Sequence, residues 1–298
     1  MKSGVINIYK EKGFTSFDVV AKMRGILKER KIGHTGTLDP DAEGVLPVCI
    51  SKATKLCDML TDKDKEYEAV MLLGVTTDTQ DVTGQVLSQS DVTADEEAVR
   101  DAILSFVGIY DQVPPMYSAL KVNGQKLCDL ARKGIEVERK ARRVEIFSIE
   151  ILEIALPKVR MRVHCSKGTY IRTLCQDIGE KLGCGGCMES LLRTRVERFG
   201  IESAITLSQL QQLADAGEAE SVLLPVDQMF DHLPVRTVKA QFRKLTDNGN
   251  ALWPNQLEKG ESKDAGQIRV YDDRDIFVGI YEYRDDTKMY KPVKIFME

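Results

Sequence analysis

The chain has 298 residues, 43% of them hydrophobic, and a formal net charge of −4 at pH 7. This length and composition predict a soluble globular protein that buries a sizeable core and has room for one large domain and a small one. No stretch approaches the ~20 apolar residues of a membrane span, and the N-terminus lacks the apolar segment of a signal peptide, so we expect a cytoplasmic protein without membrane contact.

The cysteines argue against both a disulfide framework and a metal site. They number seven and are dispersed through the chain, which predicts reduced thiols. Cys184 and Cys187 have CxxC spacing, but no second pair lies at the distance of a zinc knuckle, and His164 is the only histidine near them in sequence. We therefore expect no metal.

The charges are segregated along the chain. An acidic net charge argues against a nucleic-acid partner, but basic side chains dominate residues 121–143, and no acidic residue occurs from 158 to 172. The cations that we single out are Lys121, Lys126, Arg132, Arg142, Arg143 and, further along, Arg193. Such a pattern can attract RNA to one face of an acidic protein, and it is also typical of a solvated charged surface.

The first predicted elements are a strand over residues 5–9 and a helix that Thr15 or Ser16 caps. A short buried strand over 45–50 and a helix over 53–60 come later. Between them, residues 33–47 form a constrained loop, because Gly33, Gly36 and Gly44 permit unusual backbone angles and two prolines restrict their neighbours. Asp39 precedes Pro40 in this loop and is either a nucleophile or base, or an Asx-turn residue that satisfies its own loop.

The middle of the chain alternates strands with one irregular segment. Tyr67 begins a strand, where its ring either lines a cleft or is half-buried on the sheet. Residues 93–106 read as a helix with a capping box from Thr93 to Glu96. The segment 111–143 is rich in prolines, glycines and cations, which indicates an excursion from the core. Strands over 144–154 and 159–165 follow it.

After these strands, Thr169 is expected to cap a helix that stops near Gly183. Arg172 stands in the first turn, where the helix dipole disfavours a cation. It therefore has either a carboxylate or phosphate partner, or an intrahelical pair with Gln176 or Asp177. A helix over 206–216 closed by Gly217, a boundary near 232 and short strands over 267–271, 277–281 and 289–296 complete the prediction.

Four motifs resemble one known family. The run from His34 to Pro47, His-Thr-Gly-Thr-Leu-Asp-Pro-x-Ala-x-Gly-x-Leu-Pro, resembles the catalytic-aspartate motif of bacterial tRNA pseudouridine-55 synthases, the TruB family. Residues 9–16, 76–84 and 114–121 resemble further motifs of that family in the right order, although Tyr9 and Glu11 replace its usual Asp and Pro.

The resemblance implies a fold. It is α+β, with a mixed, mainly antiparallel sheet flanked by helices and a small β-barrel-like C-terminal domain of PUA type. The implied domains are a catalytic domain over 1–231, with an RNA-clamping insertion at about 111–143, and an RNA-binding domain over 232–298.

The resemblance also implies roles for particular residues. Asp39 falls on the family's catalytic aspartate, Arg172 on the arginine that pairs with it, and Tyr67 on the tyrosine that stacks on the target base. The other implied substrate contacts are His34 beside the base, Tyr170 across the flipped nucleotide and Leu191 in the uracil pocket. Lys10 is a scaffold or RNA-facing cation, and Asp81 is a further candidate. The basic residues singled out above would grip the tRNA T stem-loop.

The implied activity is isomerisation of uridine 55 in the T-loop of tRNA to pseudouridine, in which Asp39 attacks the sugar C1′ or assists glycal formation. No cofactor is implied, and we expect a monomer that needs no protein partner. Two alternatives are the catalytic subunit of a guide-RNA pseudouridylating particle and a tRNA-folding chaperone or RNA-binding module.

Overall fold

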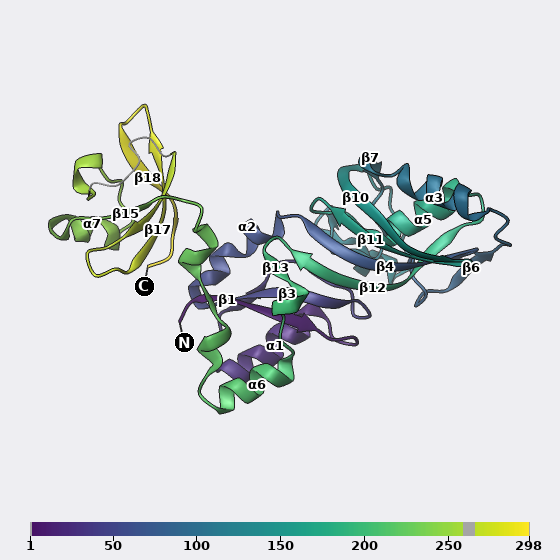
Figure 1. The fold of residues 1–298 in the computed structure, drawn as a ribbon, viewed down its shortest axis with the longest axis horizontal. Coiled ribbons are helices and arrows are strands. Elements are labelled where there is room, and N and C mark those ends of the chain that lie inside the picture. Colours follow the sequence, from purple (N-terminus) through teal and green to yellow (C-terminus); the bar gives the residue numbers. More distant parts are fainter. Residues whose placement is uncertain (1, 259–265, 298) are drawn as a thin grey trace.

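The computed structural model describes residues 2–258 and 266–297 and contains one large and one small sheet (Figure 1). The large sheet has ten strands, eight of them in the order β14-β1-β3-β12-β4-β11-β10-β7, with β13 beside β12 and β2 beside β3. Its only parallel pair in the described residues is β3 with β12. A mixed, mainly antiparallel sheet with flanking helices confirms the predicted fold class.

The large sheet, two hairpins and seven α-helices make up most of the regular structure in the described residues. The large sheet contains β1 (Gly4–Lys10), β2 (Ile32–His34), β3 (Glu43–Ile50), β4 (Lys65–Leu73), β7 (Gly108–Gln112), β10 (Arg142–Ala155), β11 (Lys158–Cys165), β12 (Gly186–Val196), β13 (Phe199–Gly200) and β14 (Leu224–Pro225). Two separate hairpins are β5 (Val75–Thr77) with β6 (Val86–Gln89), and β8 (Lys121–Val122) with β9 (Gln125–Lys126). The helices are α1 (Ser16–Leu27), α2 (Cys57–Thr61), α3 (Glu96–Leu104), α4 (Leu127–Ala131), α5 (Ile171–Lys181), α6 (Leu207–Asp215) and α7 (Arg243–Asp247).

Strands β1 and β3 are buried on both faces, which explains why residues 45–50 are almost continuously apolar. Alternate side chains point to opposite faces of a strand. Leu46 and Val48 therefore pack with α1 and α6, whereas Val45 and Cys49 belong to a second cluster. In the other half of the sheet, β4, β10 and β11 pack against α3 and α5 in a separate core (Figure 1).

The predicted helix starts are correct in two places and wrong in three. Thr15 caps α1 and Thr206 caps α6, each in a capping box. The helix predicted over 53–60 begins as a 3₁₀ turn, η1 (Ser51–Leu56). Asp95, not Thr93, caps α3, because the Asp95 side chain accepts from the Ala98 amide. Thr169 does not cap α5, since its hydroxyl donates to the Ser166 carbonyl instead.

The basic face of β11 is neutralised across the sheet, contrary to the view that residues 158–172 offer unbalanced cations. Arg160 and Arg162 both contact Glu68 on β4, at 2.8 Å each. His164 contacts Asp64 at 2.8 Å. Glu68 on β4 and Asp64 just before it supply the acids that the local sequence lacks, so β11 presents a mixed surface.

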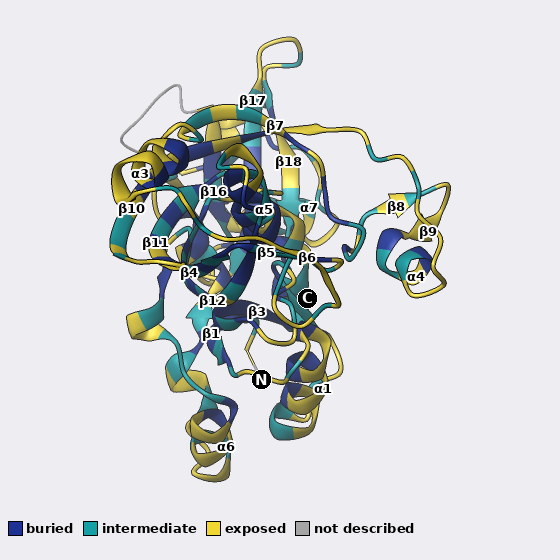
Figure 2. Cartoon of the chain, turned by 90° about the vertical axis from the view of Figure 1, so that its right-hand side faces the viewer, coloured by how far each residue is buried: buried dark blue, intermediate teal, exposed yellow. Residues whose placement is uncertain are grey.

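Residues 113–141, which make up most of the predicted insertion at 111–143, leave the large sheet, whereas the two ends of that range lie in β7 and β10 of the sheet. Figure 2 shows β8, β9 and α4 standing to one side of the large sheet, with mostly exposed residues. Leu127 and Leu130 are buried on the inner side of α4. The insertion therefore has its own small packing contact and a largely exposed outer surface.

The C-terminal part forms a separate small sheet, in the order β15 (Val235–Thr237), β16 (Gln267–Tyr271), β17 (Phe277–Arg284) and β18 (Met289–Ile295) (Figure 1). Phe230 in η4 (Val226–Phe230) packs with Phe277 and Phe296 and joins this sheet to the cluster behind β1 and β3. Within the described residues, no helix combines the length and the apolar character needed to span a membrane.

Candidate active site

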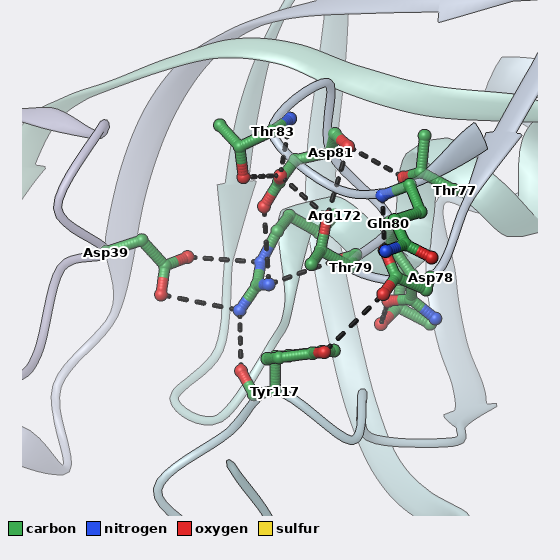
Figure 3. Close-up of polar contacts among 11 residues, drawn as sticks. Asp39, Thr77, Asp78, Thr79, Gln80, Asp81, Thr83, Tyr117 and Arg172 are labelled. Carbon is green, nitrogen blue, oxygen red and sulfur yellow. Dashed lines mark hydrogen bonds and ion pairs between the residues drawn. The ribbon is translucent and has the colours of Figure 1, made fainter. Parts of the chain in front are cut away.

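Short polar contacts anchor the loop that precedes β3 and carries Asp39. The Ser16 hydroxyl accepts from the Leu38 amide at 2.8 Å, and the Gly13 amide donates to the Pro40 carbonyl at 2.9 Å. The Ala42 amide donates to the Asp39 carbonyl at 3.1 Å. The backbone on both sides of Asp39 is thus anchored, and its carboxylate points to Arg172 rather than into a turn of its own loop (Figure 3).

Lys10 is part of this anchor. Its side chain is 0% exposed, and its ammonium donates to the carbonyls of Phe14 and Pro40 at 2.6 and 3.0 Å. Burial lowers the pKa of Lys10 to about 8, against the opposing pull of nearby carboxylates, the largest that of Glu43. Of the two roles considered for Lys10, the burial favours the scaffold role over direct contact with RNA.

Gly44 shows how closely the loop approaches β12, because a Cβ on Gly44 would overlap the carbonyl oxygen of Arg193. Its φ of +103° is also costly for any other residue. We expect Gly44→Ala to lower the free energy of unfolding by at least about 2 kcal/mol, measured by denaturant titration. Gly25→Ala, at an open position in α1, is the matched control and should stabilise by about 0.5–1 kcal/mol; equal effects would refute the close approach.

Arg172 joins three segments that are far apart in sequence (Figure 3). Its Nε lies 3.1 Å from Asp39 Oδ2, and its Nη1 lies 3.4 Å from Asp81 Oδ2. It also donates to the carbonyls of Thr79 and Tyr117, at 3.0 and 2.9 Å. These partners offset the unfavourable position of a cation in the first turn of α5, and an intrahelical pair is not formed.

The electrostatics of Asp39 reflect two opposing effects. Burial raises the pKa of its carboxyl, and the Arg172 guanidinium lowers it. Asp81 is held by Thr83, whose amide and hydroxyl both donate to Asp81 Oδ1, and by the Thr79 hydroxyl. Asp81 therefore fixes the opposite edge of the guanidinium.

Asp39 and Arg172 line a cavity of about 610 Å³. Tyr67, Tyr170 and Leu191 line the same cavity, as do residues of the insertion. The volume falls in the range of small-molecule sites. The structure therefore brings together the carboxylate, its cation and two aromatic rings from separate parts of the chain.

His34 does not line this cavity. It ends β2, is partly buried, and its Nδ1 accepts from the Gly36 amide at 3.4 Å. Burial and the charge of Arg193 lower the pKa of His34, which favours the neutral imidazole. It lies at the base of the loop that carries Asp39.

Tyr67 and Arg193 face each other across β4 and β12. Tyr67 is only 7% exposed, and burial raises its pKa to about 12. The prediction that Arg193 belongs to an RNA-facing surface is wrong, because Arg193 is 1% exposed. The strand pattern could not show this, since the register places the side chain beneath the loop.

Several residues of the site escaped the sequence reasoning. Gln112 holds Tyr170 by accepting from its amide at 2.8 Å and donating to its carbonyl at 3.0 Å. The one available signal was the position of Gln112 just before Val113 and two prolines. Thr79 and Tyr117 bind Arg172 through their backbone carbonyls. Residue type does not predict such contacts.

The predicted RNA-binding cations between 121 and 143 lie on the surface, three of them in the protruding segment and Arg142 and Arg143 on β10. Lys121, Lys126, Arg132, Arg142 and Arg143 are all exposed. Arg143 lies 3.7 Å from Asp111, and Arg132 lies 3.4 Å from Asp129. Both pairs are exposed and leave the cations accessible to phosphates.

Cys184 and Cys187 are buried thiols. In the part of the chain that the structure describes, no group of three or more histidine, cysteine or acidic side chains is arranged to hold a metal ion.

The chain is similar to proteins of known name over its whole length. It is 54% identical to tRNA pseudouridine synthase B of Lachnoclostridium phytofermentans, covering 99% of this chain and 100% of that protein. The protein of the same name from Alkaliphilus oremlandii is 47% identical, covering 98% and 97%. A chain in the crystal structure of a Cbf5-Nop10-Gar1 complex is 30% identical with a TM-score of 0.72, covering 99% of this chain and 85% of that one.

These similarities define the class of the protein, which is a pseudouridine synthase, an isomerase. Residues 24–171 match the N-terminal domain of the TruB family pseudouridylate synthases, and residues 172–231 match the C-terminal domain of tRNA pseudouridylate synthase B. The chain belongs to the TruB family.

Proposed function

We propose that the protein isomerises uridine 55 in the T-loop of tRNA to pseudouridine. The observation that carries the proposal is the Asp39–Arg172 pair on the wall of a cavity that Tyr67, Tyr170 and Leu191 also line. The names of the relatives, tRNA pseudouridine synthase B, support tRNA as the substrate.

The reaction begins with the uridine outside its stack, as in other enzymes that modify a base. Tyr67 stacks on the flipped base, Tyr170 lies on its other side, and Leu191 lines the uracil pocket. His34, neutral and next to the loop, contacts the RNA beside the vacated position. These aromatic and apolar groups replace the stacking that the base loses.

Asp39 then acts on the glycosidic bond. Arg172 keeps the carboxylate ionised and aimed, so that it attacks the sugar C1′ or assists glycal formation while the uracil detaches. The uracil rotates and rejoins C1′ through C5, and any bond between Asp39 and C1′ breaks in this step. The C5 proton is then lost, and N1, released from the sugar, takes up a proton. The product has the same atoms as the substrate, so the reaction needs no added group or electron.

The rest of the chain would hold the tRNA. The exposed cations of the insertion at 111–143 grip the T stem-loop through its phosphates and shape. We assign residues 1–231 to the catalytic domain and 232–298 to a PUA-like RNA-binding domain. We further propose that the enzyme acts in the cytoplasm as a monomer without a protein partner.

The function is tested with the purified protein alone. It should convert uridine 55 of an unmodified tRNA transcript to pseudouridine, mapped by carbodiimide treatment and primer extension. Product only after a guide RNA is added would favour the catalytic subunit of a guide-RNA particle. Binding and refolding of tRNA without any product would favour the chaperone.

The basic surface makes a separate prediction. Replacing Lys121 or Arg142 with Ala should weaken tRNA binding and reduce the slope of log Kd against log salt by about 1 per lost phosphate contact, measured by filter binding. Arg100→Ala, which removes an exposed cation from α3, is the control with an unchanged slope. Equal slopes in all variants would place the RNA elsewhere.

A further inference from the structure

Arg193 is a buried cation that the mechanism above does not use. It lies on β12 between two strands, in register with Gly44 of β3 on one side and with Tyr67 of β4 on the other. Its side chain is among the largest that are fully buried in the described residues. The guanidinium therefore sits beneath the loop that carries Asp39.

The contacts of Arg193 reach both ends of this loop. Its Nε donates to the Val45 carbonyl at 2.7 Å, and its Nη2 donates to the Gly36 carbonyl at 3.3 Å. Tyr67 is its direct neighbour on β4, and the guanidinium interacts electrostatically with the Tyr67 hydroxyl. One planar group thus ties the start of the loop, the end of the loop and the tyrosine to one another.

Burying the guanidinium of Arg193 is energetically unfavourable. Burial of a guanidinium without a carboxylate is unfavourable, and no carboxylate within salt-bridge distance of Arg193 is found in the described parts of the chain. Burial accordingly lowers its pKa, and the Tyr67 contact opposes that effect. Arg193 has two carbonyls and a phenol as its partners, and one planar guanidinium can hold all three groups in fixed directions.

We propose that Arg193 is a positioning residue for the reaction: it fixes the hydroxyl of Tyr67 relative to the loop that carries Asp39. The proposal rests on the proposed function. Tyr67 and Asp39 act on the same nucleotide from different segments, so their relative placement decides whether the reacting atoms meet. A displacement of about 1 Å can cost about 100-fold in rate.

The test compares Arg193→Met, Arg193→Lys and Arg195→Met. Arg195 lies two positions along the same strand, contacts Asp64 at 2.9 Å and is partly exposed, so its substitution removes an equal charge outside the cavity. Arg193→Met should lower kcat by about 100-fold with KM within about threefold of wild type. Arg193→Lys keeps the charge without the fork and should lose about tenfold, and it remains informative if the Met variant does not fold.

A double-mutant cycle separates positioning from general stability. In a Tyr67→Phe background the hydroxyl is already absent, so Arg193→Lys should cost less than about threefold in kcat. If the losses from the two substitutions simply multiply, or if the Arg193 variants match Arg195→Met, the proposal is overturned.

A measurement without tRNA keeps this inference distinct from the proposed function. Amide hydrogen exchange over residues 36–45 of the free protein should be at least about tenfold faster in Arg193→Lys than in Arg195→Met; unchanged exchange would remove the role of Arg193 in holding the loop. Absence of pseudouridine with the wild-type enzyme would instead defeat the proposed function and leave the exchange result standing.

Discussion

Asp39→Asn is expected to lower pseudouridine formation by at least about 10⁴-fold, because the amide can neither attack the sugar nor bear the charge that Arg172 stabilises. The side chains have nearly the same shape, so the loop and the cavity should persist. Single-turnover assays with tRNA transcript measure the loss, and filter binding should give a Kd within about threefold of wild type.

Asp41→Asn is the matched control for this variant. Asp41 lies on the same loop and also lines the cavity, but its side chain is exposed. It lies near enough to Asp39 to raise the Asp39 pKa slightly. Activity of Asp41→Asn should therefore stay close to wild type. Full turnover by Asp39→Asn, or equal losses in the two variants, would remove Asp39 from its role.

Arg172→Met is expected to lower kcat by about 10²–10³-fold. The guanidinium is buried, with a side chain that is 7% exposed, and it contacts both Asp39 and Asp81. Its loss leaves two carboxylates without their cation and frees the carbonyls of Thr79 and Tyr117. Arg172→Lys keeps the charge but cannot reach all of these partners, and should recover only part of the activity.

The pH profile distinguishes charge from shape. The pKa of Asp39 is raised by burial and held down by Arg172, so removing Arg172 should raise that pKa further. Because the active form is ionised, activity falls as pH falls through the pKa, and this acid limb should move to higher pH in Arg172→Met. Single-turnover rates across the pH range measure the limb. An acid limb at the wild-type position would show that Arg172 serves packing alone.

Local chemistry made much of the site predictable. The loop at 33–47 carries its constraint in its own glycines and prolines, and Asp39 lies where those residues restrict the backbone. The alternation in β11 and the apolar run in β3 likewise follow from the faces that each strand buries. Such features depend on neighbours in sequence, so a sequence can reveal them.

Contacts between segments that are distant in sequence could not be predicted in this way. The unbalanced cations of β11 became ion pairs only when β4 placed Glu68 beside them. Arg193 was expected at the surface, yet the register of β12 with β3 and β4 directs it under the loop. Gln112, Thr79 and Tyr117 entered the site through backbone or amide contacts.

The sequence by itself determined that Asp39, Arg172 and Tyr67 were candidates, because residue type and local backbone allow each a chemical role. The resemblance to family motifs, not the local pattern, favoured that role over a turn, an intrahelical pair or a half-buried ring. Only the tertiary structure decided how their charges are balanced. A shift of one residue in strand register moves a side chain to the opposite face of the sheet. Burial changes the free energy of a charged group by several kcal/mol. The partners of Arg172 and the buried position of Arg193 are therefore properties of the assembled sheet.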